Sequence, residues 1–179
     1  MFFALWPDEG TRHRFEAAAA KLRLSAGART IPAQNYHLTL AFLGEVEDSQ
    51  LSALREIGRA QRSGACSIEF DTCEYWHEPR VVVAAARETP AALEELTLRL
   101  HRESAPCIAL PNRQDMDRPS LRAHVTLARK VAQAPVRQEM SRVLWNASSF
   151  TLVRSETHSA RSAYTVLDTW PLLYDASAS

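Results

Sequence analysis

The chain has little of several features that mark particular classes of protein. Its 179 residues include only 3 cysteines, with no CxxC pair, and 5 glycines, and no apolar run approaches the roughly 20 residues of a membrane span. The opening, MFFALWPDEG, lacks the basic and long apolar segments of a secretory signal. Disulfide-rich, fibrous and membrane-spanning classes are therefore disfavoured. The odd number of cysteines favours a reduced, cytoplasmic protein.

Several catalytic motifs are also absent: HExxH, the phosphate-binding P-loop and GxSxG. The formal net charge is zero, which argues against a protein that wraps nucleic acid over a broad surface. The charge is uneven, however, because residues 111–165 contain 9 Lys and Arg against 4 Asp and Glu. This stretch is either a local anion site or a solvated basic face.

The most informative feature that is present is a four-residue pattern that occurs twice. It reads HLTL at residues 37–40 and HVTL at residues 124–127. With only 6 histidines in the chain, two chance matches are expected in well under about one chain in a hundred. Because side chains alternate across a strand, each copy places one imidazole and one hydroxyl on the same face.

Hydrophobic periodicity predicts a similar order of elements in each half of the chain. The first half has strands at 2–6, 36–43 and 66–76, with helices at 11–24 and after a capping Asp48. The second half has a strand at 81–86, a helix capped by Thr89, a loop at 105–119, a strand at 122–128, a short helix from Pro135 to Val143, and strands at 149–157 and 163–172. This repetition predicts one bilobal α+β domain over residues 1–179. Two lobes of mixed or antiparallel sheet with flanking helices would be related by an approximate twofold axis, with a cleft between the motif strands.

The faces of the motif strands define the candidate site. Alternation assigns these apolar residues to the core: Leu38, Leu40, Phe42, Val125 and Leu127. The opposite face carries His37 and Thr39 in one copy and His124 and Thr126 in the other. One imidazole could take a proton from a nucleophile while the other gives one to a leaving oxygen, and the hydroxyls could donate to a phosphate. The alternative is a pair of core histidines bonded to backbone carbonyls.

This arrangement favours attack on a phosphodiester without a metal or other cofactor. Neither motif has a carboxylate or cysteine at ligand spacing. The paired motifs, with FFALWP, NYHLTLAFLGEV, LRAHVTLARK and SAYTVLDTWPL, resemble the 2H phosphoesterase superfamily. Within it they resemble the RNA 2′,3′-cyclic phosphodiesterases, also called 2′-5′ RNA ligases.

The resemblance implies that the substrate is an RNA end or a small 2′,3′-cyclic nucleotide, opened to a 2′-phosphomonoester. It implies that His37 is the proton donor, that His124 is the proton acceptor, and that Thr39 and Thr126 hold the phosphate. The sequence leaves two other functions open. One is the reverse reaction, 2′-5′ ligation by the same site, and the other is a nucleotide- or RNA-binding module that does not react.

Three further residues are candidates for nucleotide binding. Strict alternation places Arg129 on the face opposite His124, so it needs a bulge or strand end to reach a nucleotide, and otherwise it is a surface charge. Trp76 and Arg80, with Tyr75, could form a wall on which a base stacks, or the aromatic rings could pack in the core. The remaining histidines, at positions 13, 77, 101 and 158, lie in no repeated context and are expected at the surface.

Overall fold

The computed structural model describes residues 1–108, 121–134, 139–158 and 161–173. The elements are β1 (Phe2–Leu5), α1 (Glu9–Ala19), β2 (Arg29–Thr30), η1 (Ala33–Asn35), β3 (Leu38–Phe42), α2 (Asp48–Ala60), β4 (Cys66–Trp76), β5 (Val81–Ala86), α3 (Ala91–Ser104), η2 (Ala105–Cys107), β6 (His124–Arg129), β7 (Glu139–Ala147), β8 (Ser149–His158) and β9 (Arg161–Pro171). Within these described ranges, no helix is long and apolar enough to cross a membrane.

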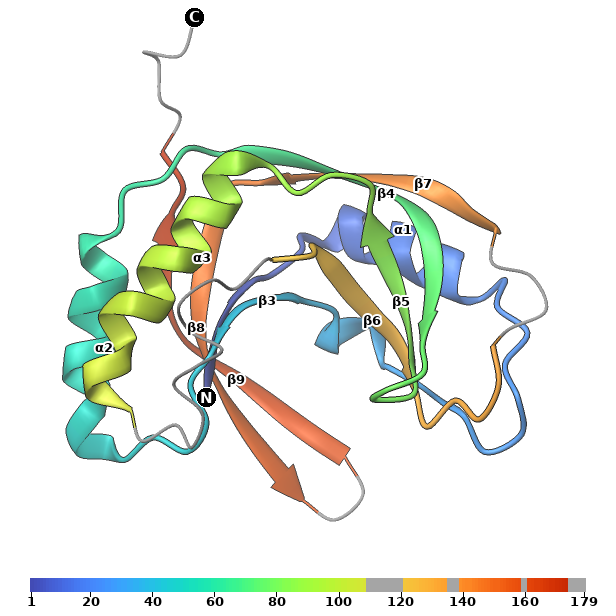
Figure 1. Cartoon of the computed structure of the whole chain (residues 1–179), viewed down its shortest axis with the longest axis horizontal. Helices are drawn as coiled ribbons and strands as arrows, with labels where there is room; N and C mark the ends of the chain where they lie inside the picture. The colour runs from blue at the N-terminus through green and yellow to red at the C-terminus, as the bar shows by residue number, and fades with distance from the viewer. Residues whose placement is uncertain (109–120, 135–138, 159–160, 174–179) are drawn as a thin grey trace, which may run out of the picture.

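The strands form two antiparallel sheets, which confirms the predicted α+β fold class. The first sheet has the order β3-β1-β8-β9 and the second has the order β2-β6-β5-β4-β7. In each sheet the motif strand pairs with the first strand of its own half, β3 with β1 and β6 with β5. Figure 1 shows β3 and β6 in the middle of the molecule, where they contact one another.

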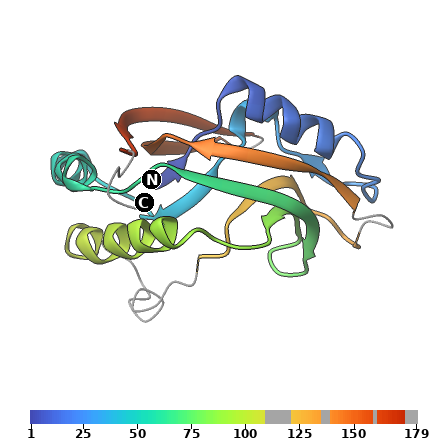
Figure 2. The ribbon, with the colours of Figure 1, turned by 90° about the horizontal axis from the view of Figure 1, so that it is seen from above.

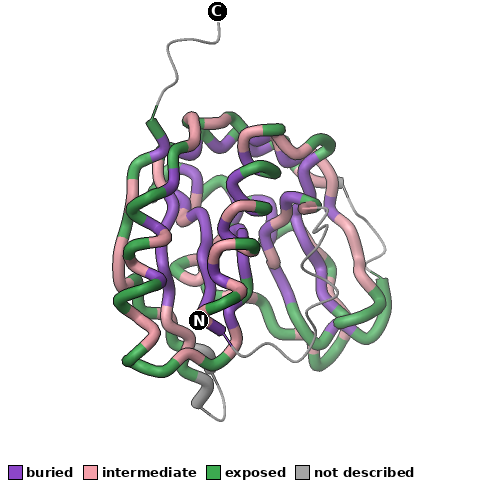
Figure 3. The backbone as a smooth tube through the Cα atoms, turned by 60° about the vertical axis from the view of Figure 1, so that its left-hand side comes forward, coloured by how far each residue is buried: buried purple, intermediate pink, exposed green. Residues whose placement is uncertain are grey.

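The two lobes exchange strands rather than forming consecutive halves of the chain. Strand β4 follows the first motif but lies in the second sheet, and β8 and β9 follow the second motif but lie in the first sheet. Figure 2 shows α1 beside β7, and α2 and α3 together at the other end of the molecule. One continuous hydrophobic cluster joins the lobes, and it includes Phe3, Phe15, Phe70 and Trp145. Figure 3 shows the buried backbone running along the strands.

Residues around 140 were expected to form a short helix, and this prediction is wrong. The structure has strand β7 there, while Val136 lies outside the described residues. Buried Val143, Trp145 and Ala147 alternate with exposed neighbours, and β7 pairs along β4. The spacing of Met140 and Val143 suggested a helical period, but the period-2 pattern of the longer stretch decides the structure.

The starts of three helices also differ from the sequence prediction. Helix α1 begins at Glu9, after Asp8, whose carboxylate accepts the Thr11 amide at 2.6 Å. Helix α2 is capped by Glu47 rather than by Asp48. Helix α3 follows Pro90 and is not capped by Thr89. The Thr89 hydroxyl instead donates to the carbonyl of Leu121 at 2.8 Å and accepts from the amide of Ala123 at 3.1 Å, so it fixes the segment that leads into β6.

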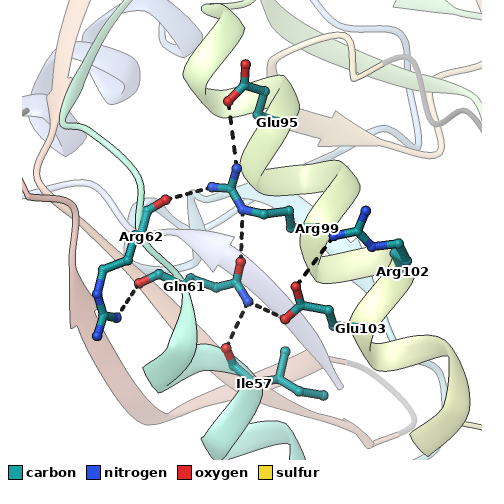
Figure 4. A network of polar contacts seen from close by, with 7 residues as sticks. All are labelled: Ile57, Gln61, Arg62, Glu95, Arg99, Arg102 and Glu103. Atoms are coloured by element: carbon teal, nitrogen blue, oxygen red, sulfur yellow. Dashed lines mark hydrogen bonds and ion pairs between the residues drawn. The ribbon is translucent and has the colours of Figure 1, made fainter. Parts of the chain in front are cut away.

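A polar network ties the end of α2 to α3 (Figure 4). The Gln61 side chain is only 7% exposed. Its amide nitrogen donates to the Ile57 carbonyl at 3.0 Å and to Glu103 at 2.7 Å, and its oxygen accepts from Arg99 at 3.2 Å. Because buried amide groups are costly to leave unpaired, this network fixes α3, which packs against the motif strand β3.

Candidate active site

Both motifs keep the predicted alternation through their four residues. The aliphatic members are buried: Leu38, Leu40, Val125 and Leu127. The histidines and threonines are half-buried and lie on the opposite face. His37 immediately precedes β3, and His124 is the first residue of β6. The two copies therefore present the same groups at the start of neighbouring strands.

The two imidazoles are held in the same way. Nδ1 of His37 lies 2.7 Å from the carbonyl oxygen of Asn35, and Nδ1 of His124 lies 2.8 Å from that of Arg122. Because a carbonyl only accepts, Nδ1 carries the hydrogen in both rings. Nε2 is left as the nitrogen that can exchange a proton with a substrate.

Each motif strand contains a bulge directly after its threonine. In β3, Leu40 has no partner in β1, because its neighbours Thr39 and Ala41 pair with successive residues of that strand. In β6, Leu127 is unpaired in the same way. The bulge makes two successive residues of each strand point inward, and it changes the face of every residue that follows.

The bulge in β6 brings Arg129 to the face of the second motif. Arg129 pairs with Val81, and Thr126 pairs with Val83. Because Val81 and Val83 are two residues apart in one strand, their partners share a face. The bulge that Arg129 needs in order to reach a nucleotide is therefore present.

The bulge in β3 makes the prediction that Phe42 is a core residue wrong. Phe42 is 60% exposed. It pairs with Phe2, while Thr39 pairs with Ala4, so Phe42 lies on the face of the first motif. Phe42 and Arg129 thus occupy equivalent places, because each lies three residues after the threonine of its motif.

Aromatic rings surround the His37 imidazole. The centroid of Phe2 is 4.9 Å from it, that of Trp6 is 5.4 Å and nearly parallel, and that of Tyr164 is 5.2 Å and edge-on. None of these three rings is among the site residues predicted from the sequence. The alternation of FFALW could have placed Phe2 and Trp6 on one face, but no local signal shows that this face lies beside His37.

The residues at the end of β4 that could form a base-stacking wall lie on two different faces of the strand. Trp76 lies against His124, with ring centroids 4.5 Å apart, and its Nε1 donates to Glu74 at 3.0 Å. Tyr75 points away and donates its hydroxyl to the Val131 carbonyl at 3.1 Å, within a small buried cluster. Arg80 is exposed in the turn before β5, with φ of 63°. Trp76 is therefore beside the motif, and Tyr75 has a packing role.

In the described part of the chain, no three His, Cys, Asp or Glu side chains gather closely enough to hold a metal ion.

The chain resembles known proteins over nearly its whole length. It is 32% identical to an RNA 2′,3′-cyclic phosphodiesterase of Escherichia coli, over 96% of both chains. It is 30% identical to a protein of the same name from Thermus thermophilus, over 96% of this chain and 89% of the relative. A family model described as LigT-like phosphoesterase matches residues 5–83. The chain belongs to the LigT-like phosphoesterase family.

Solved structures support this membership. The crystal structure of E. coli LigT complexed with 3′-AMP superposes with a TM-score of 0.84 at 27% identity, over 96% of each chain. LigT complexed with ATP gives a TM-score of 0.82 at 28% identity, again over 96% of each chain. The second motif lies outside the segment that the family model matches, so the whole-chain likenesses are what extend the relationship to it.

Burial lowers the pKa of both motif histidines in this LigT-like phosphoesterase. The pKa of His37 falls from 6.5 to about 4, mainly through desolvation, while the hydrogen bond to Asn35 raises it and the charge of Arg129 lowers it. Desolvation also lowers the pKa of His124, where the hydrogen bond to Arg122 and the carboxylate of Glu74 act in the opposite direction. Both rings are therefore neutral at pH 7 before an anion binds.

This burial predicts a loss of stability in mild acid. An unfolded histidine takes up a proton near pH 6.5, but folded His37 does so only near pH 4, so the unfolded state binds more protons between these values. The free energy of unfolding should thus fall as the pH is lowered through this window. Urea unfolding at pH 7.5, 6 and 5 should show a smaller fall in His37→Gln than in the wild type. Equal falls in the two proteins would contradict the assignment, and exposed His13→Gln is the control.

His101 is not the surface residue that the sequence predicted. Its Nε2 lies 3.1 Å from the carbonyl oxygen of Leu40, the bulge residue of β3. In β6, the carbonyl of the bulge residue Leu127 accepts from the amide of Ile31, just after β2, at 2.8 Å. Among the described strands β3 lies at the edge of its sheet, so none of them supplies that donor, and His101 from α3 supplies it instead. Burial lowers the pKa of His101, so it donates as the neutral ring.

Removing the His101 donor should disturb the first motif through the backbone of β3, and not through a contact with the substrate. His101→Leu should lower kcat/KM by about fivefold, the worth of one ordinary hydrogen bond, whereas His101→Gln keeps a donor and should recover much of the loss. The change should fall mainly on kcat, because the misplaced group is the motif strand. Equal activity of the Leu and Gln variants, or a change in melting temperature alone, would show that His101 only packs.

Proposed function

We propose that this protein is an RNA 2′,3′-cyclic phosphodiesterase that opens cyclic phosphate ends to 2′-phosphomonoesters without a metal ion. The observation that carries the proposal is the matched pair of motifs, with both Nδ1 atoms committed to carbonyls and a threonine beside each histidine. The names of the two relatives at 30% and 32% identity support the same reaction.

The reaction needs one proton taken and one given. The Nε2 of His124 accepts a proton from water, whose oxygen attacks the phosphorus. The bond between phosphorus and the 3′ oxygen breaks, and the Nε2 of His37 gives its proton to that oxygen. Thr39 and Thr126 donate hydrogen bonds to the non-bridging oxygens, where negative charge gathers.

The proton donor must be charged, although burial opposes this in the free protein. With the pKa of His37 at about 4, the imidazolium forms only when the anionic substrate lies beside it. Since kcat/KM reports the free enzyme and kcat reports the complex, the pKa of the donor should be higher in the kcat profile.

Residues beside the motifs supply contacts to the nucleotide. Arg129 provides a positive charge on the motif face, and the exposed ring of Phe42 offers a surface on which a base can stack. Trp76 lies beside His124, and Arg80 is an exposed cation at the adjoining turn. LigT is known in complex with ATP and with 3′-AMP, which supports small nucleotides or RNA ends as ligands here. The three unpaired cysteines support a location in the cytoplasm.

Product analysis tests this function. The protein should convert each 2′,3′-cyclic mononucleotide into the 2′-monophosphate alone, resolved from the 3′ isomer by chromatography. A 3′,5′-cyclic nucleotide serves as the control for ring geometry. Formation of the 3′-monophosphate, or no turnover by a folded protein, would overturn the proposal.

A further inference from the structure

Glu74 of β4 lies on the same face of the second sheet as the second motif. It pairs with Val83 of β5, and Val83 in turn pairs with Thr126 of β6. Directly opposed residues of an antiparallel pair point to the same side of the sheet, so these three residues share a face. Trp76 shares it too, because it lies two residues after Glu74 in the same strand. Figure 1 shows β4, β5 and β6 side by side.

The Glu74 carboxylate holds both of the groups that fix His124. Its Oε1 accepts a hydrogen bond from the guanidinium of Arg122, and its Oε2 accepts one from Nε1 of Trp76 at 3.0 Å. The Arg122 carbonyl is the acceptor that binds Nδ1 of His124 at 2.8 Å, and the Trp76 ring lies 4.5 Å from the imidazole. One carboxylate therefore joins the group that sets the tautomer to the ring that limits the orientation.

The pair of Glu74 and Arg122 differs from an ordinary surface ion pair. Exposed pairs contribute little, because water screens both charges. The Glu74 side chain is only 26% exposed, whereas the two side chains of the Arg59–Glu56 pair on α2 are 65% and 69% exposed. Glu74 also accepts the second hydrogen bond, from the indole of Trp76. Its position is therefore fixed from two sides.

The carboxylate also acts on the charge of the imidazole. Burial has the largest effect on the pKa of His124 and lowers it, the charge of Arg122 lowers it further, and the Glu74 carboxylate raises it. Arg129 and His37 face the site from β6 and the first motif, and both are positive when protonated. Since His124 becomes positive when it takes a proton from water, the negative charge of Glu74 favours that state.

We propose that Glu74 is a positioning residue for the general base His124. It acts through Arg122 and Trp76, which it holds against the imidazole, and its charge stabilises the imidazolium. This inference rests on the proposed function. In that step water loses a proton to Nε2 of His124, its oxygen bonds to phosphorus, and the bond from phosphorus to the 3′ oxygen breaks. Glu74 itself exchanges no proton.

An NMR titration tests the role of the charge without relying on turnover. Glu74→Gln keeps an acceptor for the indole and removes only the charge, so the pKa of His124, followed at its Cε1 proton, should fall by about half a pH unit. Arg122→Gln leaves Glu74 unopposed and should raise this pKa by a similar amount. The double variant removes both charges and should return close to the wild-type value.

Activity on a 2′,3′-cyclic mononucleotide tests the positioning. Glu74→Leu removes both hydrogen bonds and should lower kcat about five- to tenfold, while Glu74→Gln should lower it only about two- to threefold. KM should change less than kcat, because the displaced group is the base. The matched control is Glu69, which also lies on β4 and pairs with an arginine, Arg142, at 2.5 Å. Glu69→Gln and Glu69→Leu should leave both kcat and the pKa of His124 unchanged.

Three results would overturn the inference. They are an unchanged pKa of His124 in Glu74→Gln, a double variant no closer to the wild type than Glu74→Gln, and equal losses of kcat in Glu74→Leu and Glu69→Leu. If the wild type hydrolyses no cyclic nucleotide, the proposed function fails, and the titration alone judges Glu74. Opposite changes in the two single variants would then support its place beside His124, and no change would contradict it.

Discussion

Replacing either motif histidine should abolish most of the cyclic phosphodiesterase activity. His37→Ala and His124→Ala should each lower kcat by about a hundred- to ten-thousandfold, the range that one general acid or base supplies. The double variant should be little slower than either single variant, because the two rings act in one concerted transfer of protons. Single-turnover rates with a 2′,3′-cyclic nucleotide measure this directly.

His77→Ala provides the control, since His77 is exposed and outside both motifs. His37→Gln and His124→Gln keep a polar side chain and separate lost chemistry from lost packing. Near-wild-type turnover in either folded single variant would contradict the two-histidine mechanism. So would a double variant whose loss equals the product of the single losses, because the rings would then act independently.

The motif threonines should have the next largest effect. A hydrogen bond to a charged group is worth roughly 1.5–3 kcal/mol, so Thr39→Val and Thr126→Val should each slow turnover about ten- to a hundredfold. Valine keeps the shape of threonine and removes only the donor. Thr→Ser keeps the donor and should retain much of the activity, while Thr→Ala should resemble Thr→Val.

Measuring kcat for all three variants at both positions, with circular dichroism to confirm folding, separates donor from shape. Thr169→Val is the control, because Thr169 is exposed on β9. Valine variants as active as the wild type would show that the hydroxyls do not hold the phosphate. Backbone amides or arginines would then have to do so.

The sequence predicts the motif faces correctly because alternation along a strand is a local property. Burial of Leu38 and Val125, opposite the half-buried histidines, follows from that period alone. The fold class follows from the repeated order of elements. The exchange of β4, β8 and β9 between lobes does not follow, since it depends on which distant strands pair.

The residues around the site depend on the register between paired strands, and this register cannot be predicted from local sequence patterns. Arg129 and Phe42 reach the motif faces only because Leu127 and Leu40 form bulges, which strict alternation cannot anticipate. Likewise, Tyr164 comes from β9, more than a hundred residues after His37. His101 looked like an exposed helical residue, and only the edge position of β3 gives it a partner.

In the proposed reaction, two histidines open a cyclic phosphate without a metal ion. The most direct measurement is the single-turnover rate on an oligonucleotide with a 2′,3′-cyclic phosphate, in excess chelator, from pH 5 to 9. We expect full activity in chelator and a bell-shaped profile, because one ring must be neutral while the other is charged. Activity lost in chelator and restored by Mg²⁺, Mn²⁺ or Zn²⁺ would contradict the claim.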